Sequence, residues 1–91
     1  MVVTVDEAKG YLRVDHDDDD SLIDTLIQTA QMLCMDILRT DDEAVLGEVV
    51  NAKAAVLYAM AYLYEHREEA DHHALVLSLR SLLFGNREAG F

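Results

Sequence analysis

Aspartate is the residue type whose spacing in this chain comes nearest to a site for chemistry. Asp15, Asp17 and Asp19 have the 1-3-5 spacing with which an EF-hand loop begins to coordinate calcium. Such a loop also needs glycine at its sixth position, for a sharp turn, and glutamate at its twelfth, as a bidentate ligand. Asp20 and Leu26 occupy those two positions. We therefore interpret the acidic run as a solvated turn that leads into a helix, and we predict no bound metal.

The histidines and the single cysteine form no ligand pattern either. His66, His72 and His73 are close in sequence but lack the spacing of a zinc site, and Cys34 is remote from them. Cys34 falls on the apolar side of a predicted helix, where we expect a small buried side chain rather than a reactive thiol. Because there is one cysteine, no disulfide bond within the chain is possible.

The sequence also lacks the groups that nucleophilic or acid–base catalysis needs. Ser21, Ser78 and Ser81 lie in helical patterns, without the strained turn that exposes a catalytic serine. The four glycines are scattered and form no phosphate-binding loop. Carboxylates are abundant, but on faces expected to be exposed, with no sign of a dry pocket that would shift their pKa values. We predict that the protein is not an enzyme and takes no cofactor.

Composition limits the partners that such a chain can bind. Its 91 residues predict one domain, residues 1–91. The 18 acidic and 7 basic residues give a net charge of −11, which disfavours direct binding to nucleic acid phosphates and to anionic membranes. The longest apolar run, residues 54–64, is too short to cross a bilayer, and the N-terminus has no signal-peptide pattern.

The apolar content exceeds what a domain of this size needs. Of all residues 52% are hydrophobic, although a chain this small has only a thin core. A tight bundle rich in alanine would account for this composition. We favour a second explanation, in which part of the surface is buried against other subunits.

Helical periodicity predicts an all-α fold, a small bundle of about four helices. Thr4 and Glu7 have the capping-box spacing that opens a short N-terminal helix, which ends near Arg13. One of the aspartates at 18–20 is expected to cap a long second helix that runs to about Thr40. Nine apolar residues recur along it at helical spacing: Leu22, Ile23, Leu26, Ile27, Ala30, Leu33, Cys34, Ile37 and Leu38.

Two further helices complete the prediction. After a break at residues 40–43, the pattern predicts a single long helix that is antiparallel to the second. Its last residues, 65–69, are polar or charged and are expected to face water. It has two apolar sides, so it is either central or shared with a neighbouring chain. A shorter last helix begins at residues 71–73 and ends near Gly85. The expected apolar residues of these two helices are Leu46, Val49, Val56, Met60, Leu63, Ala54, Ala55, Tyr58, Ala61 and Tyr62, then Leu75, Leu79, Leu82 and Leu83.

Tyrosines and scarce cations mark a candidate surface for subunits or partners. Tyr58 and Tyr62 are four residues apart and lie along one helix face, either as a core edge or in a subunit interface, where tyrosine is enriched. Arg67 either pairs within its own helix or reaches the acidic turn of a neighbouring chain. The candidate interface residues are Tyr58, Tyr62, Arg67, Asp17, Asp18 and the C-terminal aromatic Phe91.

Three blocks of sequence follow one another over nearly the whole chain. The first is Val-Thr at 3–4, Glu-Ala-Lys at 7–9 and Leu-Arg-Val-Asp-His-Asp at 12–17, ahead of Leu-Ile at 22–23. The second runs from Lys-Ala-Ala-Val-Leu at 53–57 into Tyr-Leu-Tyr-Glu-His-Arg-Glu at 62–68. The third is Leu79, Leu-Leu at 82–83, Arg-Glu at 87–88 and Phe91. In this order the blocks resemble the head–tail connector (adaptor) family of long-tailed bacteriophages and prophages.

The resemblance implies a small all-α protein that forms a ring of about a dozen copies under the portal protein. Such a ring would join the portal to a tail-completion (stopper) protein, with DNA passing through without specific binding. The implied location is the head–tail interface of the virion, and the bacterial host cytoplasm during assembly. We expect an acidic lumen to let DNA slide without sticking. A small acidic helical protein-binding or regulatory module is the alternative function.

Overall fold

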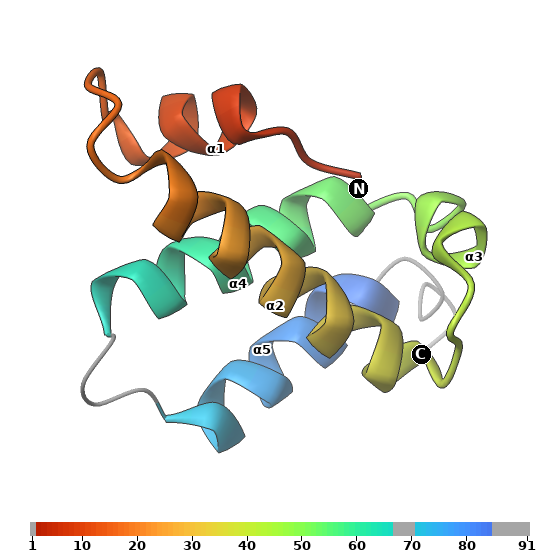
Figure 1. Ribbon diagram of the computed structural model, residues 1–91. Coiled ribbons are helices and arrows are strands. Elements are labelled where there is room, and N and C mark those ends of the chain that lie inside the picture. The colour runs from red at the N-terminus through yellow and green to blue at the C-terminus, as the bar shows by residue number, and fades with distance from the viewer. Residues whose placement is uncertain (1, 67–70, 85–91) are drawn as a thin grey trace.

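The computed structural model describes residues 2–66 and 71–84, and these residues form a helical bundle (Figure 1). The described residues contain no β-strand, so the predicted all-α class is confirmed. Four helices have at least eight residues and one is a short turn of helix. The helices are α1 (Val5–Leu12), α2 (Asp20–Leu38), α3 (Glu43–Gly47), α4 (Ala52–Glu65) and α5 (His72–Phe84).

The ends of α1 follow the sequence prediction. The Thr4 hydroxyl accepts a hydrogen bond from the Glu7 backbone N–H at 3.1 Å, and the Glu7 carboxylate accepts one from the Thr4 N–H at 3.0 Å. This capping box satisfies two backbone donors that a helix N-terminus leaves without partners. The helix ends where Arg13 adopts the left-handed conformation, with φ of 63°.

The predicted apolar stripe of α2 is buried. Ile23, Ile27, Ala30 and Cys34 have no exposed surface, because their spacing puts them on the side that faces the other helices. The prediction that an aspartate side chain caps this helix is wrong. Asp19 occupies the N-cap position, but its side chain forms no capping hydrogen bond.

The prediction of a single long helix after residue 43 is also wrong, because the structure has two helices there, α3 and α4. Residues 48–51 turn the chain between α3 and α4. The N–H groups of Glu48, Val49 and Ala52 each donate a hydrogen bond to the carbonyl three residues earlier. Leu46 remains buried, whereas Val50 is 81% exposed. A distant contact lies at this break, where the Asn51 side chain donates a hydrogen bond to the carbonyl of Leu82 at 3.1 Å.

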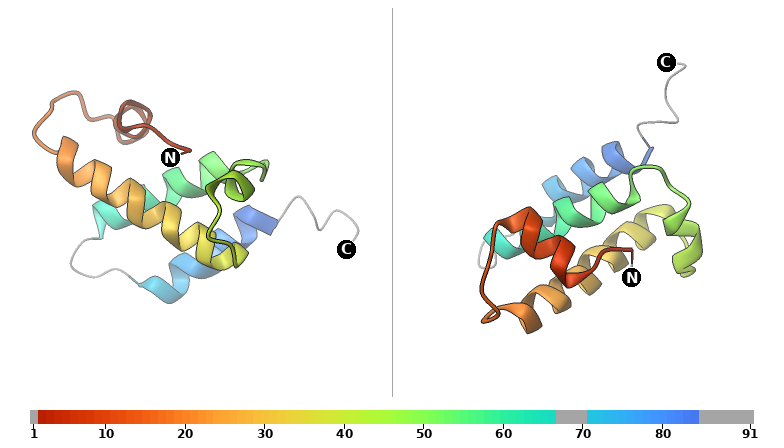
Figure 2. Two further views of the ribbon diagram at one scale, coloured as in Figure 1. Left: turned by 45° about the vertical axis from the view of Figure 1, so that its right-hand side comes forward. Right: turned by 90° about the horizontal axis from the view of Figure 1, so that it is seen from above.

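The long helices α2 and α4 run antiparallel through the middle of the bundle (Figures 1 and 2). Both α1 and α5 pack against this pair, and within the described residues α1 and α5 do not contact each other. They therefore lie on different sides of the α2–α4 pair. The predicted start of α5 is confirmed, with the Asp71 carboxylate accepting a hydrogen bond from the Ala74 N–H at 3.0 Å. The predicted end at Gly85 lies outside the described residues.

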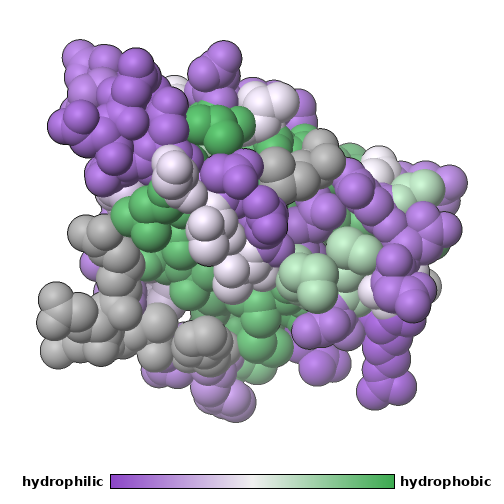
Figure 3. All heavy atoms as spheres, viewed as in Figure 1, coloured by the Kyte–Doolittle hydropathy of each residue, from purple (hydrophilic) through white to green (hydrophobic). Residues whose placement is uncertain are grey.

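Polar and apolar side chains are unevenly distributed on the face seen in Figure 3. Hydrophilic atoms gather over the acidic turn between α1 and α2, and hydrophobic atoms form a band across the middle of the same face. Six large hydrophobic side chains of the described residues are exposed, namely Tyr11, Met32, Val45, Val50, Tyr58 and Leu77. No helix in the described ranges is long and apolar enough to span a membrane.

Candidate subunit interface

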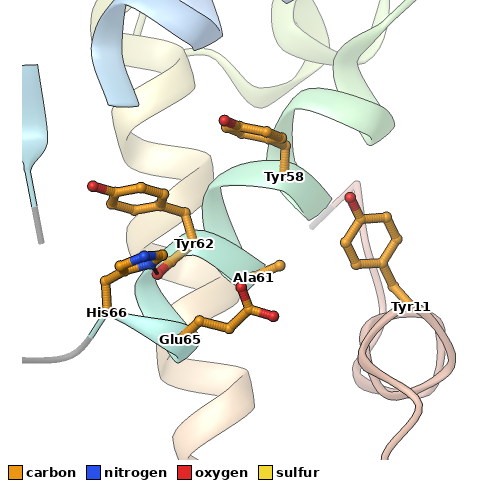
Figure 4. Close-up of a pocket in the computed structure, with 6 residues that line it drawn as sticks. All are labelled: Tyr11, Tyr58, Ala61, Tyr62, Glu65 and His66. Carbon is orange, nitrogen blue, oxygen red and sulfur yellow. Dashed lines mark hydrogen bonds between the residues drawn. The ribbon is translucent and has the colours of Figure 1, made fainter. Parts of the chain in front are cut away.

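Three tyrosines from two helices line a shallow groove on the surface. Its volume is about 380 Å³, and it lies between α1 and the outer side of α4. In Figure 4, Tyr58 and Tyr62 extend from α4. Ala61 and Glu65 of the same helix point toward α1, which carries Tyr11. The groove is lined by Tyr11, Tyr58, Ala61, Tyr62, Glu65 and His66, and we call it the tyrosine groove.

The two tyrosines predicted from α4 have different surroundings. The Tyr62 hydroxyl accepts a hydrogen bond from the Asp71 backbone N–H at 2.9 Å, and its ring stacks on His66 with centroids 4.3 Å apart. Tyr62 thus fastens the start of α5 to α4. Tyr58 is 38% exposed and forms no hydrogen bond with other described residues, so part of its surface is open to a partner.

Lys9 of α1 holds the acidic turn against the bundle. Its ammonium lies 2.7 Å from the Asp17 carboxylate and 2.9 Å from that of Asp20, and its side chain is only 13% exposed. Donation by the ammonium to the Asp17 and Asp20 carboxylates raises the pKa of Lys9 above its usual value. In turn the Lys9 hydrogen bond lowers the pKa of Asp17. Two of the turn's carboxylates are therefore paired within the chain.

The other aspartates of the turn point in different directions. Asp19 accepts a hydrogen bond from the Tyr64 hydroxyl of α4 at 2.8 Å, which explains why its carboxylate does not cap α2. The Asp18 side chain is 92% exposed, and its carboxylate lies 4.0 Å from Nδ1 of His16. Both candidate interface residues in this turn have exposed side chains, Asp18 at 92% and Asp17 at 88%, and Asp17 also contacts Lys9.

A second ion pair joins α1 to α4 beside the tyrosine groove. The Lys53 ammonium donates a hydrogen bond to the Glu7 carboxylate, and this contact lowers the pKa of Glu7. Because Glu7 also completes the capping box, one side chain both starts α1 and fixes it to α4. These contacts fix α1, which carries Tyr11, beside α4, which carries Tyr58.

Cys34 is a packing residue, as the sequence predicts. It is a free thiol with no exposed surface, and burial raises its pKa to about 12. No group of three or more histidine, cysteine or carboxylate side chains among the described residues is arranged to hold a metal ion.

Sequence reasoning placed some interface candidates but missed others. Arg67 and Phe91 lie outside the described residues, so their proposed contacts stay predictions. Tyr11 was missed because its short helix gives no sign of packing beside α4. Lys9 was missed as well, although it is one of only two cations, with Arg13, in the segment before the acidic turn, where acidic residues are frequent.

Comparison with known proteins identifies the family. The family model described as Phage gp6-like head-tail connector protein matches residues 2–85, a range that includes all five described helices. A search of curated proteins and a search of solved structures each returned no match. The match agrees with the resemblance carried by the three sequence blocks. The chain therefore belongs to the phage head–tail connector family, whose members are structural proteins of the junction between head and tail.

Proposed function

We propose that this protein assembles as a ring of about a dozen copies that joins the portal to a tail-completion protein, with DNA passing through its lumen. Assembly takes place in the host cytoplasm, and the finished ring lies at the head–tail interface of the virion. The observation that carries the proposal is the connector-family match over residues 2–85.

Features of the surface support an assembling role. Six large hydrophobic side chains are exposed among the described residues of a small chain, and two of them face the tyrosine groove. Exposed aromatic side chains beside a groove are typical of protein interfaces. The net charge of −11 is compatible with DNA that passes through a ring without being held.

The candidate contact residues are Tyr58, Tyr62, Arg67, Asp17, Asp18 and Phe91. Tyr58 gives the cleanest test, because Tyr62 and Asp17 also stabilise the subunit itself. Replacing Tyr58 with serine is expected to weaken assembly and leave the helical content unchanged. The matched control is Met32→Ser, which removes an exposed apolar side chain from α2, far from the groove residues in sequence. Arg67→Ala, followed by sedimentation, tests the proposed contact with a neighbouring acidic turn.

Native mass spectrometry of the chain, alone and mixed with its portal protein, tests the function. A closed ring, free or bound to the portal, is the expected result. A species that stays monomeric or dimeric at all concentrations and does not bind the portal would contradict a connector role. That outcome would favour the alternative function, a small acidic protein-binding module.

A further inference from the structure

The outward side of α5 differs in charge from the rest of the molecule. Residues 72–84 contain no aspartate or glutamate, whereas each of the other four helices contains at least one. His73, Leu77 and Arg80 recur at spacings of four and three, so they lie along one side of α5. All three are exposed, and Leu77 is 56% exposed. We call these three residues the α5 stripe.

The α5 stripe points away from its own subunit. Leu75, Leu79 and Leu83 are the buried residues of α5, and they pack against α2 and α4. The stripe lies on the other side of the helix and cannot reach the tyrosine groove of the same chain. Arg80 forms no ion pair with another described residue, unlike Lys9 and Lys53, which are held by carboxylates of their own chain.

The tyrosine groove has the complementary chemistry. Tyr11 and Tyr58 offer aromatic surface, 51% and 38% exposed, and Ala61 leaves room between them. Glu65 supplies a carboxylate at one end of the groove and forms no ion pair within the described residues. Such a site accepts an aliphatic side chain followed by a guanidinium, which both stacks on aromatic rings and pairs with carboxylates.

We propose that the α5 stripe of one copy docks in the tyrosine groove of the next copy. Leu77 packs against Tyr58 and Ala61, while Arg80 pairs with Glu65. The proposal rests on the proposed ring. It explains how a ring could close, because a contact between two different patches is head-to-tail and repeats around an axis, whereas a self-complementary patch stops at a dimer.

Other exposed apolar side chains fit the groove less well. Met32 lies four residues before Asp36 on the same side of α2, and both are exposed. Val50 is two residues after the exposed Glu48. Either would bring a second carboxylate toward Glu65, and like charges at close range oppose binding. Among these surfaces, the α5 stripe is the one that combines an exposed leucine with a cation.

Charge reversal at the two positions tests the pairing. Glu65→Arg places two arginines at each contact between copies, and Arg80→Glu places two glutamates there. We expect each variant alone to lose the ring under conditions in which the wild-type chain assembles, with the portal present if it is needed. In an equimolar mixture every contact between unlike copies pairs an arginine with a glutamate. The mixture is therefore expected to recover assembly, in alternating order, when measured by native mass spectrometry.

Controls separate this inference from the proposed function. Glu48→Arg and Arg39→Glu make the same charge changes outside the two patches and should leave assembly intact, while circular dichroism confirms that all variants fold. Failure of the wild-type chain to assemble, alone or with portal, overturns the proposed function. A wild-type ring together with undisturbed single variants, or with a mixture that stays unassembled, overturns the docking proposal alone.

Discussion

At the residue scale, the acidic turn is organised by one lysine and one tyrosine. Lys9 neutralises Asp17 and Asp20 from α1, and the Tyr64 hydroxyl holds Asp19 from α4. A run of adjacent carboxylates repels itself, and partners on two helices reduce that repulsion while they fix the angle at which α2 leaves the turn. The aspartates that suggested a metal loop are thus mostly structural contacts within the subunit.

The Lys9 contact makes stability depend on pH in a defined direction. Because Lys9 lowers the pKa of Asp17 below its ordinary value of 3.8, the contact contributes fully above that pH and is lost as the pH falls through the lowered value. Lys9→Met is expected to lower the free energy of unfolding at pH 7 and to flatten its decrease below pH 4. Urea unfolding at pH 7 and pH 3 measures both effects. Asp18→Asn is the matched control, and an unchanged pH slope in Lys9→Met would contradict the assignment.

Cys34 gives a second prediction at this scale. Its thiol is fully buried with a pKa of about 12, so it should react with a thiol reagent only after the protein opens. Cys34→Ser places a hydroxyl at this apolar site and is expected to cost about 1–3 kcal/mol if that hydroxyl finds no partner. Reagent kinetics with and without urea, and thermal unfolding of the variant, provide the measurements. Rapid labelling of the native protein would show that the site is open to solvent.

At the scale of elements, the sequence predicted features set by near neighbours better than features that involve distant residues. The capping box at Thr4 and the stripe of α2 depend on neighbours within a few residues, and both were found in the sequence. The break at residues 48–51 was not predicted, and the hydrogen bond found at its end, from Asn51 to Leu82, joins residues 31 apart in sequence. The tyrosine groove was half predicted for the same reason. Tyr58 and Tyr62 share one helix, whereas Tyr11 joins them through packing between helices.

The left-handed residue after α2 allows a test of this element's end. Arg39 has φ of 58°, a conformation in which a side chain is strained and glycine is not. Arg39→Gly is expected to raise the free energy of unfolding by about 0.5–1 kcal/mol. The same change at Arg80, in the middle of α5, should lower it by about 1 kcal/mol. Chemical denaturation of both variants measures the difference. Destabilisation by Arg39→Gly would mean that the Arg39 side chain stabilises the fold by more than its backbone strain costs.

At the scale of the whole molecule, strong acidity and assembly oppose each other. Each subunit has a net charge of −11, so neighbouring copies in a ring repel at long range. Short contacts such as the proposed pairing of Glu65 with Arg80 have to overcome that repulsion. The same charge that hinders assembly also repels DNA phosphates, which suits a passage through which DNA moves.

Salt separates these two electrostatic effects. The screening length shrinks from about 30 Å at 0.01 M ionic strength to about 8 Å at 0.15 M, so repulsion between whole subunits weakens sooner than an ion pair in direct contact. We expect wild-type assembly to strengthen over this range, as measured by sedimentation velocity at fixed protein concentration. Asp41→Asn, which removes an exposed charge outside the two docking patches and outside the candidate contact residues, should reduce the dependence on salt. Assembly that weakens steadily from the lowest salt would instead mean that attractive pairs between subunits dominate, and the ring would then require an interface richer in charge pairs than the one proposed.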